Sequence, residues 1–192
     1  MTNWTNWSGS VRAEPAQFAQ PRRLADLQDL VRGAGKVRVV GAGHSFTPLC
    51  ETDGLLLNLA ELEGELVVAP DRRTVTAPAG WSLKRLTKAM WDEGLSLPNQ
   101  GDVNPQSLAG AIGTGTHGTG RDLGSLSTLV QGVRAVMADG TVVETSRAQD
   151  PDLFEGHPLS LGPFGLTPAE LGSAWCWDRV WSSVGPASLQ NN

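Results

Sequence analysis

The segment VRVVGAGHSF at residues 37–46 constrains the fold more than any other stretch of the chain. Its valines predict a short buried strand over residues 37–40, because β-branched side chains favour extended backbone. Gly41 and Gly43 then allow a tight turn in which successive N–H groups point at one spot. Such a nest of N–H groups suits an anion such as a pyrophosphate, and the same turn presents the imidazole of His44.

Two familiar phosphate-binding motifs do not fit this turn. The dinucleotide fingerprint G-x-G-x-x-G needs a third glycine where Phe46 stands, and Pro48 interrupts the helix that should follow. The phosphate loop of nucleotide hydrolases needs a Gly-Lys-Ser/Thr sequence that does not follow here. An ordinary strand-to-loop turn with a hydrogen-bonded histidine stays open as the alternative.

A second unusual segment, GAIGTGTHGTG at residues 110–120, contains five glycines, three threonines and no charged residue. This glycine density disfavours a regular helix or strand, and small residues allow a ligand to approach the main chain. A flexible linker is the alternative. The preceding residues 104–109 predict a turn that opens into a short helix, which a linker would not need. We therefore expect a loop that contacts a ligand.

Hydrophobic periodicity and turn residues predict a mixture of helices and strands without a regular βαβ alternation. The predicted fold class is therefore α+β rather than a doubly wound sheet. The predicted elements are helices over 24–32 and 82–93, the second capped by Ser82; strands over 37–40 and 55–59; hairpins pairing 66–69 with 74–77 and 129–137 with 141–145; and a helical turn that starts at Asp150-Pro151.

Composition excludes several classes of function. A net charge of −5 over 192 residues, without a basic stripe, argues against nucleic acid as a partner. The chain has no apolar signal segment and no integral membrane segment, so we expect a cytoplasmic protein. Cys50 and Cys176 have no metal-ligand spacing, so we expect reduced thiols and no metal. The spacing of His157, Cys176 and Asp178 does not support a nucleophilic triad.

Four motifs, taken in order, resemble one family. They are NWSG near the start, VRVVGAGHSF, LPNQGDVNPQSLAGAIGTGTHGTG and ADGTVVE. Together they are similar to the aldonolactone and alditol oxidases, flavoproteins of the vanillyl-alcohol-oxidase type, over roughly residues 3–166. The resemblance implies a two-lobed, PCMH-type FAD-binding domain over residues 1–166. Its lobes would cover about 1–63 and 64–166, with FAD extended between them.

The resemblance also implies which residues contact FAD. His44 would be the covalent attachment point, bonded from a ring nitrogen to the 8α-methyl group of the flavin. Gly101 would leave oxygen a path to the flavin ring. Asp102 stands at a position that contacts FAD in this family, but the match is to the position and not to the residue type. The other matching positions are Val39, Val40, Gly41, Ala42, Gly43, Ser45, Gly80, Ser107, Gly110, Ala111, Ile112, Gly113, Thr114, His117 and Gly118.

The implied activity is FAD-dependent oxidation of a CH–OH group in a sugar 1,4-lactone or polyol. Hydride would pass to the flavin, and molecular oxygen would be the acceptor and give hydrogen peroxide. Family members continue into a domain that binds the substrate and supplies the base. We expect that domain to be missing here, so no catalytic residue is assigned.

The likeness stops at Thr167, and residues 167–192 are predicted to be an atypical tail, frameshifted or disordered. The alternatives to an active enzyme are a non-catalytic FAD-binding remnant and a cofactor half that another chain completes.

Overall fold

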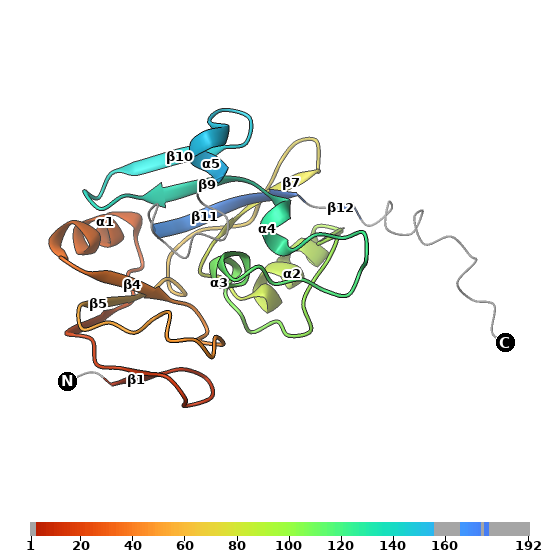
Figure 1. Ribbon diagram of the computed structural model, residues 1–192. Helices are drawn as coiled ribbons and strands as arrows, with labels where there is room; N and C mark the ends of the chain where they lie inside the picture. Colours follow the sequence, from red (N-terminus) through yellow and green to blue (C-terminus); the bar gives the residue numbers. More distant parts are fainter. Residues whose placement is uncertain (1–2, 156–165, 174, 177–192) are drawn as a thin grey trace.

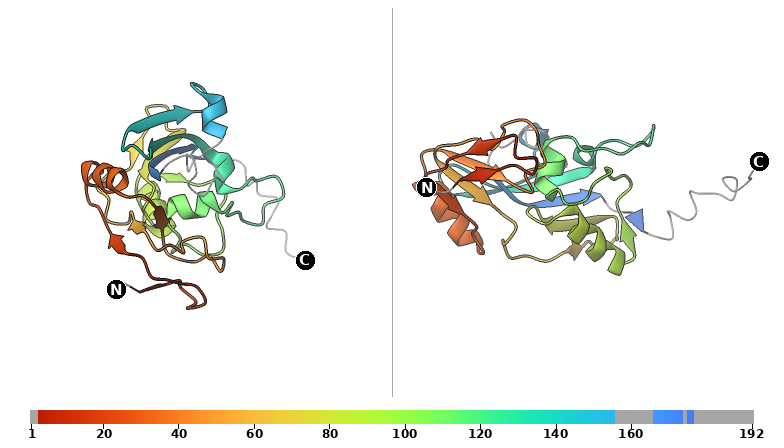
Figure 2. Two further views of the ribbon diagram at one scale, coloured as in Figure 1. Left: turned by 60° about the vertical axis from the view of Figure 1, so that its left-hand side comes forward. Right: turned by 90° about the horizontal axis from the view of Figure 1, so that it is seen from below.

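The computed structural model describes residues 3–155, 166–173 and 175–176. In this part of the chain the strands form a three-stranded sheet, a five-stranded sheet and two two-stranded pairs. In Figure 1, helix α1 (Leu24–Gly33) lies on the left and helix α2 (Leu83–Asp92) lies to the right of the centre, and Figure 2 gives two further views. The mixture of helices and strands agrees with the predicted α+β class.

The three-stranded sheet is parallel and has the order β3-β5-β4. Strand β4 (Val37–Val40) has the predicted bounds, and β5 (Leu55–Asn58) ends one residue earlier than predicted. Strand β3 (Gln17–Ala19) was not predicted, because three residues are too few to show an alternation. Helix α1 connects β3 to β4 and confirms the predicted helix. The turn with His44 therefore begins at the carboxyl end of a parallel strand.

The five-stranded sheet is antiparallel throughout and has the order β10-β9-β11-β7-β6 (Figure 1). Both predicted hairpins are confirmed: β6 pairs with β7, and β9 pairs with β10. Gly140, in the turn between β9 and β10, has a φ of 79°, which favours glycine. The strands are β6 (Val67–Val68), β7 (Thr74–Pro78), β9 (Val130–Val136), β10 (Val142–Ser146) and β11 (Leu166–Ser173).

Strand β11 lies between β9 and β7 and pairs with both. Its register with β9 shifts between Leu166 and Ala169, and this irregularity accommodates Pro168, which has no N–H to donate. Residues 169–172 of the predicted tail are therefore paired on both sides, and Ser173 pairs with β7. The prediction of an atypical tail did not foresee this. Residues 156–165, 174 and 177–192 lie outside the described part.

Helix α2 begins as predicted, because the Ser82 hydroxyl accepts a hydrogen bond from the Arg85 N–H at 3.1 Å. It ends before Gly94, whose φ is 69°. Its buried face, which includes Leu86 and Met90, packs in one core with β7, β9 and α3. The remaining helices are α3 (Leu108–Gly113), α4 (Leu126–Leu129) and α5 (Pro151–Glu155).

Helix α3 corrects the prediction for the glycine-rich segment. Residues 110–113 are helical, although their glycine content disfavoured it. Burial explains the difference, since Ala111 and Ile112 lie in the core and Ser107 caps the helix through the Gly110 N–H.

The two short pairs join β1 (Trp4–Thr5) to β2 (Arg12–Ala13), and β8 (Leu95–Ser96) to β12 (Trp175–Cys176). Strands β1 and β2 bring the start of the chain back toward the turn after β4. Among the described helices, none combines the length and the apolar character that crossing a membrane requires.

Candidate cofactor site

The turn after β4 leaves a row of backbone donors without partners. None of the N–H groups of residues 42–46 donates a hydrogen bond to another group in the described part of the chain. Gly43 has a φ of 66°, so the turn includes a residue in the left-handed region. A left-handed residue within a turn is a feature of anion-binding nests. The arrangement therefore matches the predicted nest better than an ordinary turn.

Three alternate carbonyl groups of the same turn are held by the surrounding protein. The Gly41 carbonyl accepts from Asn58 Nδ2 at 3.3 Å, and the Gly43 carbonyl accepts from the Trp7 N–H at 3.0 Å. The Ser45 carbonyl accepts from Asn6 Nδ2 at 3.0 Å. These bonds fix the peptide planes, so the free N–H groups are preorganised rather than mobile.

The first glycine-rich stretch contacts Ser107, three residues before the second stretch, at Gly41. A Cβ atom added to Gly41 would lie 1.9 Å from the Ser107 hydroxyl oxygen and 2.8 Å from its Cβ. Ser107 is buried, with 9% of its surface exposed, and its hydroxyl accepts from the Gly110 N–H at 3.3 Å. The start of α3 therefore contacts the end of β4 directly, and only glycine fits at position 41.

A second close contact, at Gly80, links the segment after β7 in the five-stranded sheet to the segment after β5 in the three-stranded sheet. A Cβ atom on Gly80 would lie 2.0 Å from the carbonyl oxygen of Leu59, just after β5. The neighbouring Ala79 carbonyl accepts from the Ala109 N–H at 2.9 Å. The segments around residues 41, 58–60, 79–81 and 107–109 thus contact one another in a closed circuit.

A second cluster contains the predicted residues at 101 and 116–118. A Cβ atom on Gly101 would lie 2.7 Å from the Thr116 methyl group, and one on Gly118 would lie 2.3 Å from the Gln100 carbonyl oxygen. His117 is exposed, and its Nδ1 lies 2.8 Å from the Gly118 carbonyl oxygen. Asp102 is also exposed and has no hydrogen bond to a described residue.

Gln106 links this second cluster to the segments around Gly41 and Ser107. Its Nε2 donates a hydrogen bond to the Thr116 hydroxyl at 3.1 Å. Gln106 directly precedes Ser107, which contacts Gly41. No hydrogen bond or ring contact within the described chain links His44 itself to residues 101–118.

Trp7 stacks on His44, with the ring centroids 5.1 Å apart and the planes inclined by 18°. Neither Asn6 nor Trp7 was predicted to contact the site. The motif NWSG, which contains both residues, was the available signal. Asn58 and Gln106 were also missed, because a single amide side chain in a loop has no distinctive pattern.

The residues present fit FAD. Trp81 Nε1 and Gln106 Oε1 are buried without hydrogen-bond partners, which is costly unless a ligand or water supplies them. Residues 41–46 and 110–120 contain no lysine or arginine, so a bound pyrophosphate would be held there by backbone N–H groups. Within the described residues no group of three or more His, Cys, Asp or Glu could hold a metal ion.

Cys50, a free thiol in the loop after this turn, donates from Sγ to the Val39 carbonyl at 3.4 Å. Burial raises the pKa of this thiol, and the charge of Arg38 opposes that shift. The folded protein therefore keeps the Cys50 proton at a pH where the unfolded chain has lost it. The free energy of unfolding falls as the pH rises above the ordinary thiol pKa.

Alkylation of Cys50 checks this environment. In a Cys176→Ser variant we expect iodoacetamide to react more slowly with the folded chain than with the denaturant-unfolded chain, because less thiolate is present. The rate should also reach half its maximum at a higher pH in the folded chain. Coincident pH profiles for the two states would contradict the burial of Cys50.

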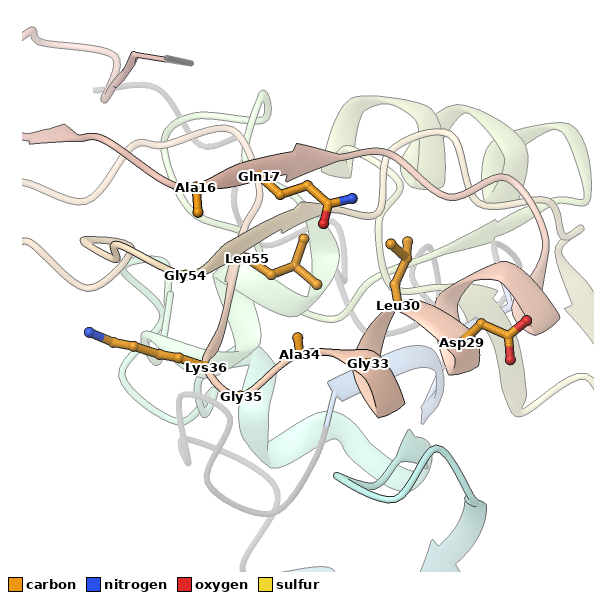
Figure 3. A pocket seen from close by; sticks show the side chains of 10 residues that line it. All are labelled: Ala16, Gln17, Asp29, Leu30, Gly33, Ala34, Gly35, Lys36, Gly54 and Leu55. Carbon is orange, nitrogen blue, oxygen red and sulfur yellow. The ribbon is translucent and has the colours of Figure 1, made fainter.

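A pocket of about 470 Å³ lies at the opposite edge of the three-stranded sheet (Figure 3). It opens at the amino ends of β3, β4 and β5, whereas ligands of parallel sheets bind at the carboxyl ends. None of the predicted FAD-contacting residues lines it, so it is not the candidate cofactor site. Its lining residues are Ala16, Gln17, Asp29, Leu30, Gly33, Ala34, Gly35, Lys36, Gly54 and Leu55.

Together, the glycine contacts and the free N–H groups define a nucleotide-cofactor domain. Residues 15–146, more than half of the chain, match the family described as FAD binding domain. The chain therefore belongs to the FAD binding domain family.

Several relatives are enzymes of aldonolactone oxidation. The chain is 37% identical over 167 residues to L-gulono-1,4-lactone dehydrogenase of Mycobacterium tuberculosis, covering 85% of this chain and 38% of the relative. It is 33% identical over 165 residues to L-gulonolactone oxidase of Mus musculus, with coverage of 84% and 38%. The chain thus spans well under half the length of these relatives.

A third relative extends the likeness. The putative D-arabinono-1,4-lactone oxidase of Neurospora crassa is 33% identical over 183 residues, covering 93% of this chain and 33% of the relative. Because 93% of this chain is more residues than the segment 1–166 contains, the alignment with this relative extends beyond residue 166.

Proposed function

We propose that the chain is the cofactor-holding part of an FAD-dependent oxidoreductase of the sugar 1,4-lactone or alditol oxidase type. The observation that carries this proposal is the row of unpartnered N–H groups at residues 42–46, fixed where Gly41 contacts Ser107. A pyrophosphate carries two negative charges and would satisfy these donors. The family membership and the named relatives agree with this chemistry.

The FAD domain is proposed to have two lobes, about 1–63 and 64–166, with the cofactor extended between them. Two separate cores support this division. One core combines α1 with the three-stranded sheet and also includes Val136 at the end of β9, and the other combines α2 and α3 with the five-stranded sheet. Close contacts at Gly41 and Gly80 hold the two proposed lobes together. These glycines would therefore set the distance between the lobes at which a cofactor would bind.

When bound, FAD would supply the electron-accepting chemistry, and the chain would bind and orient it. Residues 39–45 would hold the pyrophosphate. Ser107 and residues 110–114, 117 and 118 would lie along the cofactor with Gly80, Gly101 and Asp102. The substrate would be a sugar lactone or a polyol, with oxygen as the acceptor, which Gly101 would admit. The relatives include both an oxidase and a dehydrogenase.

His44 is the proposed attachment point for the flavin. The tether requires one new bond between an imidazole nitrogen and the 8α carbon, and it breaks one C–H bond at that carbon. One hydrogen leaves the imidazole and one leaves the 8α carbon, and two electrons pass to molecular oxygen to give hydrogen peroxide. A neutral imidazole is the nucleophile that this step needs.

Acid denaturation tests the attachment. Wild-type chain loaded with FAD should keep its flavin absorbance after acid precipitation, and His44→Ala should keep none, because the only proposed covalent link is removed. His117→Ala is the matched control, since that histidine is exposed and also lies among the proposed site residues. Equal retention in wild type and His44→Ala would show that His44 is not the attachment point.

A second candidate is a cofactor-binding protein without turnover of its own. Peroxide production separates the two candidates. The loaded chain is assayed with gulonolactone, arabinonolactone, xylitol and sorbitol. Peroxide from any of these supports the oxidase, and bound flavin without turnover on all four supports the second candidate.

A further inference from the structure

Asn6 and Trp7 contact three consecutive residues of the turn after β4. The Trp7 N–H donates to the Gly43 carbonyl at 3.0 Å, just before His44. Asn6 Nδ2 donates to the Ser45 carbonyl at 3.0 Å, just after it. The Trp7 indole stacks on the imidazole itself, at 5.1 Å between centroids. His44 is therefore held on both sides along the backbone and on one face of its ring.

The support for these contacts is rigid. Asn6 is 5% exposed, and its Oδ1 accepts from the Val11 N–H at 2.9 Å. Its Nδ2 also lies 3.1 Å from the Ser8 hydroxyl and 3.2 Å from the Ser10 hydroxyl. Strands β1 and β2 pair on either side of this loop. An amide with this many partners has little freedom to rotate, so the bond to Ser45 is fixed in direction.

Burial does not explain the position of Trp7. Its side chain is 65% exposed, and the 70% exposed Phe46 meets it edge-on at 6.2 Å between centroids. Large aromatic side chains usually bury most of their surface, so an exposed indole stacked on an imidazole has its main contact there. This stacking restricts rotation of the His44 ring without enclosing it.

We infer that Asn6 and Trp7 form a clamp that holds the His44 imidazole in one orientation for bonding to the flavin. The inference rests on the His44 attachment proposed above. Fixing a nucleophile before it reacts lowers the entropic part of the barrier. Trp7 is a positioning residue here, since it acts through His44. The Trp7 side chain should therefore change how fast the tether forms, and not how tightly FAD binds before attachment.

The rate of attachment tests this inference. FAD is added to the purified flavin-free chain in air, and acid-stable flavin is followed over time. Trp7→Leu should slow attachment about three- to tenfold, the factor that corresponds to the stacking free energy of one aromatic pair. Trp7→Phe keeps a stacking ring and should recover most of the rate. Trp91→Leu, which replaces an exposed tryptophan on α2, is the control and should leave the rate unchanged.

Two further measurements separate positioning from a structural role. In a His44→Ala background, adding Trp7→Leu should leave the dissociation constant for FAD unchanged. In the flavin-free chain, the stacked indole should shift the His44 ring protons upfield in NMR spectra, and Trp7→Leu should remove that shift while the His117 signals stay in place.

Three outcomes would overturn the clamp: attachment at the wild-type rate in Trp7→Leu, weaker FAD binding in the double variant than in His44→Ala, or His44 signals that Trp7→Leu does not move. These differ from failure of the proposed attachment, in which the wild-type chain itself would retain no flavin after acid. The upfield shift needs no cofactor, so it tests the stacking independently of that result.

Discussion

Gly80→Ala is expected to lower the melting temperature of the flavin-free chain by roughly 10 °C. The added Cβ would lie 2.0 Å from the Leu59 carbonyl oxygen and 2.4 Å from its carbonyl carbon. These are backbone atoms at the end of a buried strand, so neither can move aside as a flexible side chain would. Overpacking of this kind costs about 3 kcal/mol, which corresponds to that temperature change in a chain of this size.

The matched control is Gly33→Ala. Gly33 ends α1, has no positive φ, and has nothing within 4 Å of the position of an added Cβ. Alanine should therefore fit there and raise stability by about 0.5 kcal/mol, because it restricts the unfolded chain. Thermal unfolding followed by circular dichroism compares the two variants. Equal melting temperatures would contradict the close contact between Gly80 and Leu59.

Gly41→Ala should weaken both folding and FAD binding. The added Cβ would lie 1.9 Å from the Ser107 hydroxyl oxygen, which would push the end of β4 away from α3. We expect a loss of about 2 kcal/mol in the free energy of unfolding. We also expect roughly tenfold weaker FAD binding, equivalent to about 1.4 kcal/mol, because the N–H groups after Gly41 are displaced.

The contact also predicts a rescue. Ser107→Gly removes both side-chain atoms that the new Cβ would meet, and glycine replaces serine at a helix N-cap at a cost of only a few tenths of a kcal/mol. The double variant Gly41→Ala/Ser107→Gly should therefore recover most of the stability and affinity lost in Gly41→Ala. Urea unfolding and FAD titration give the coupling free energy between the positions. Additive effects would show that Gly41 and Ser107 do not touch.

Features that depend on neighbouring residues could be predicted from the sequence. The strand over 37–40 follows from its valines, and the start of α2 follows from the hydroxyl of Ser82. The hairpin between β9 and β10 follows from Asp139-Gly140, where glycine permits the left-handed turn. The nest after β4 belongs to the same group, since its glycines lie within the turn itself.

The remaining features depend on residues far apart in the sequence. The helical state of residues 110–113 follows from burial of Ala111 and Ile112, which outweighs the local preference of glycine. The place of β11 between β9 and β7 depends on pairing with strands whose sequences do not specify a partner.

The sequence by itself determined the turn at residues 41–45, because backbone conformation at glycine is a local property. Only the tertiary structure decided that Ser107 lies against Gly41 and that Asn6 and Trp7 hold the residues around His44. Those contacts come from segments that folding brings together. They arise because the three-stranded sheet, the five-stranded sheet and the β1–β2 pair pack together. Local sequence patterns do not specify this packing.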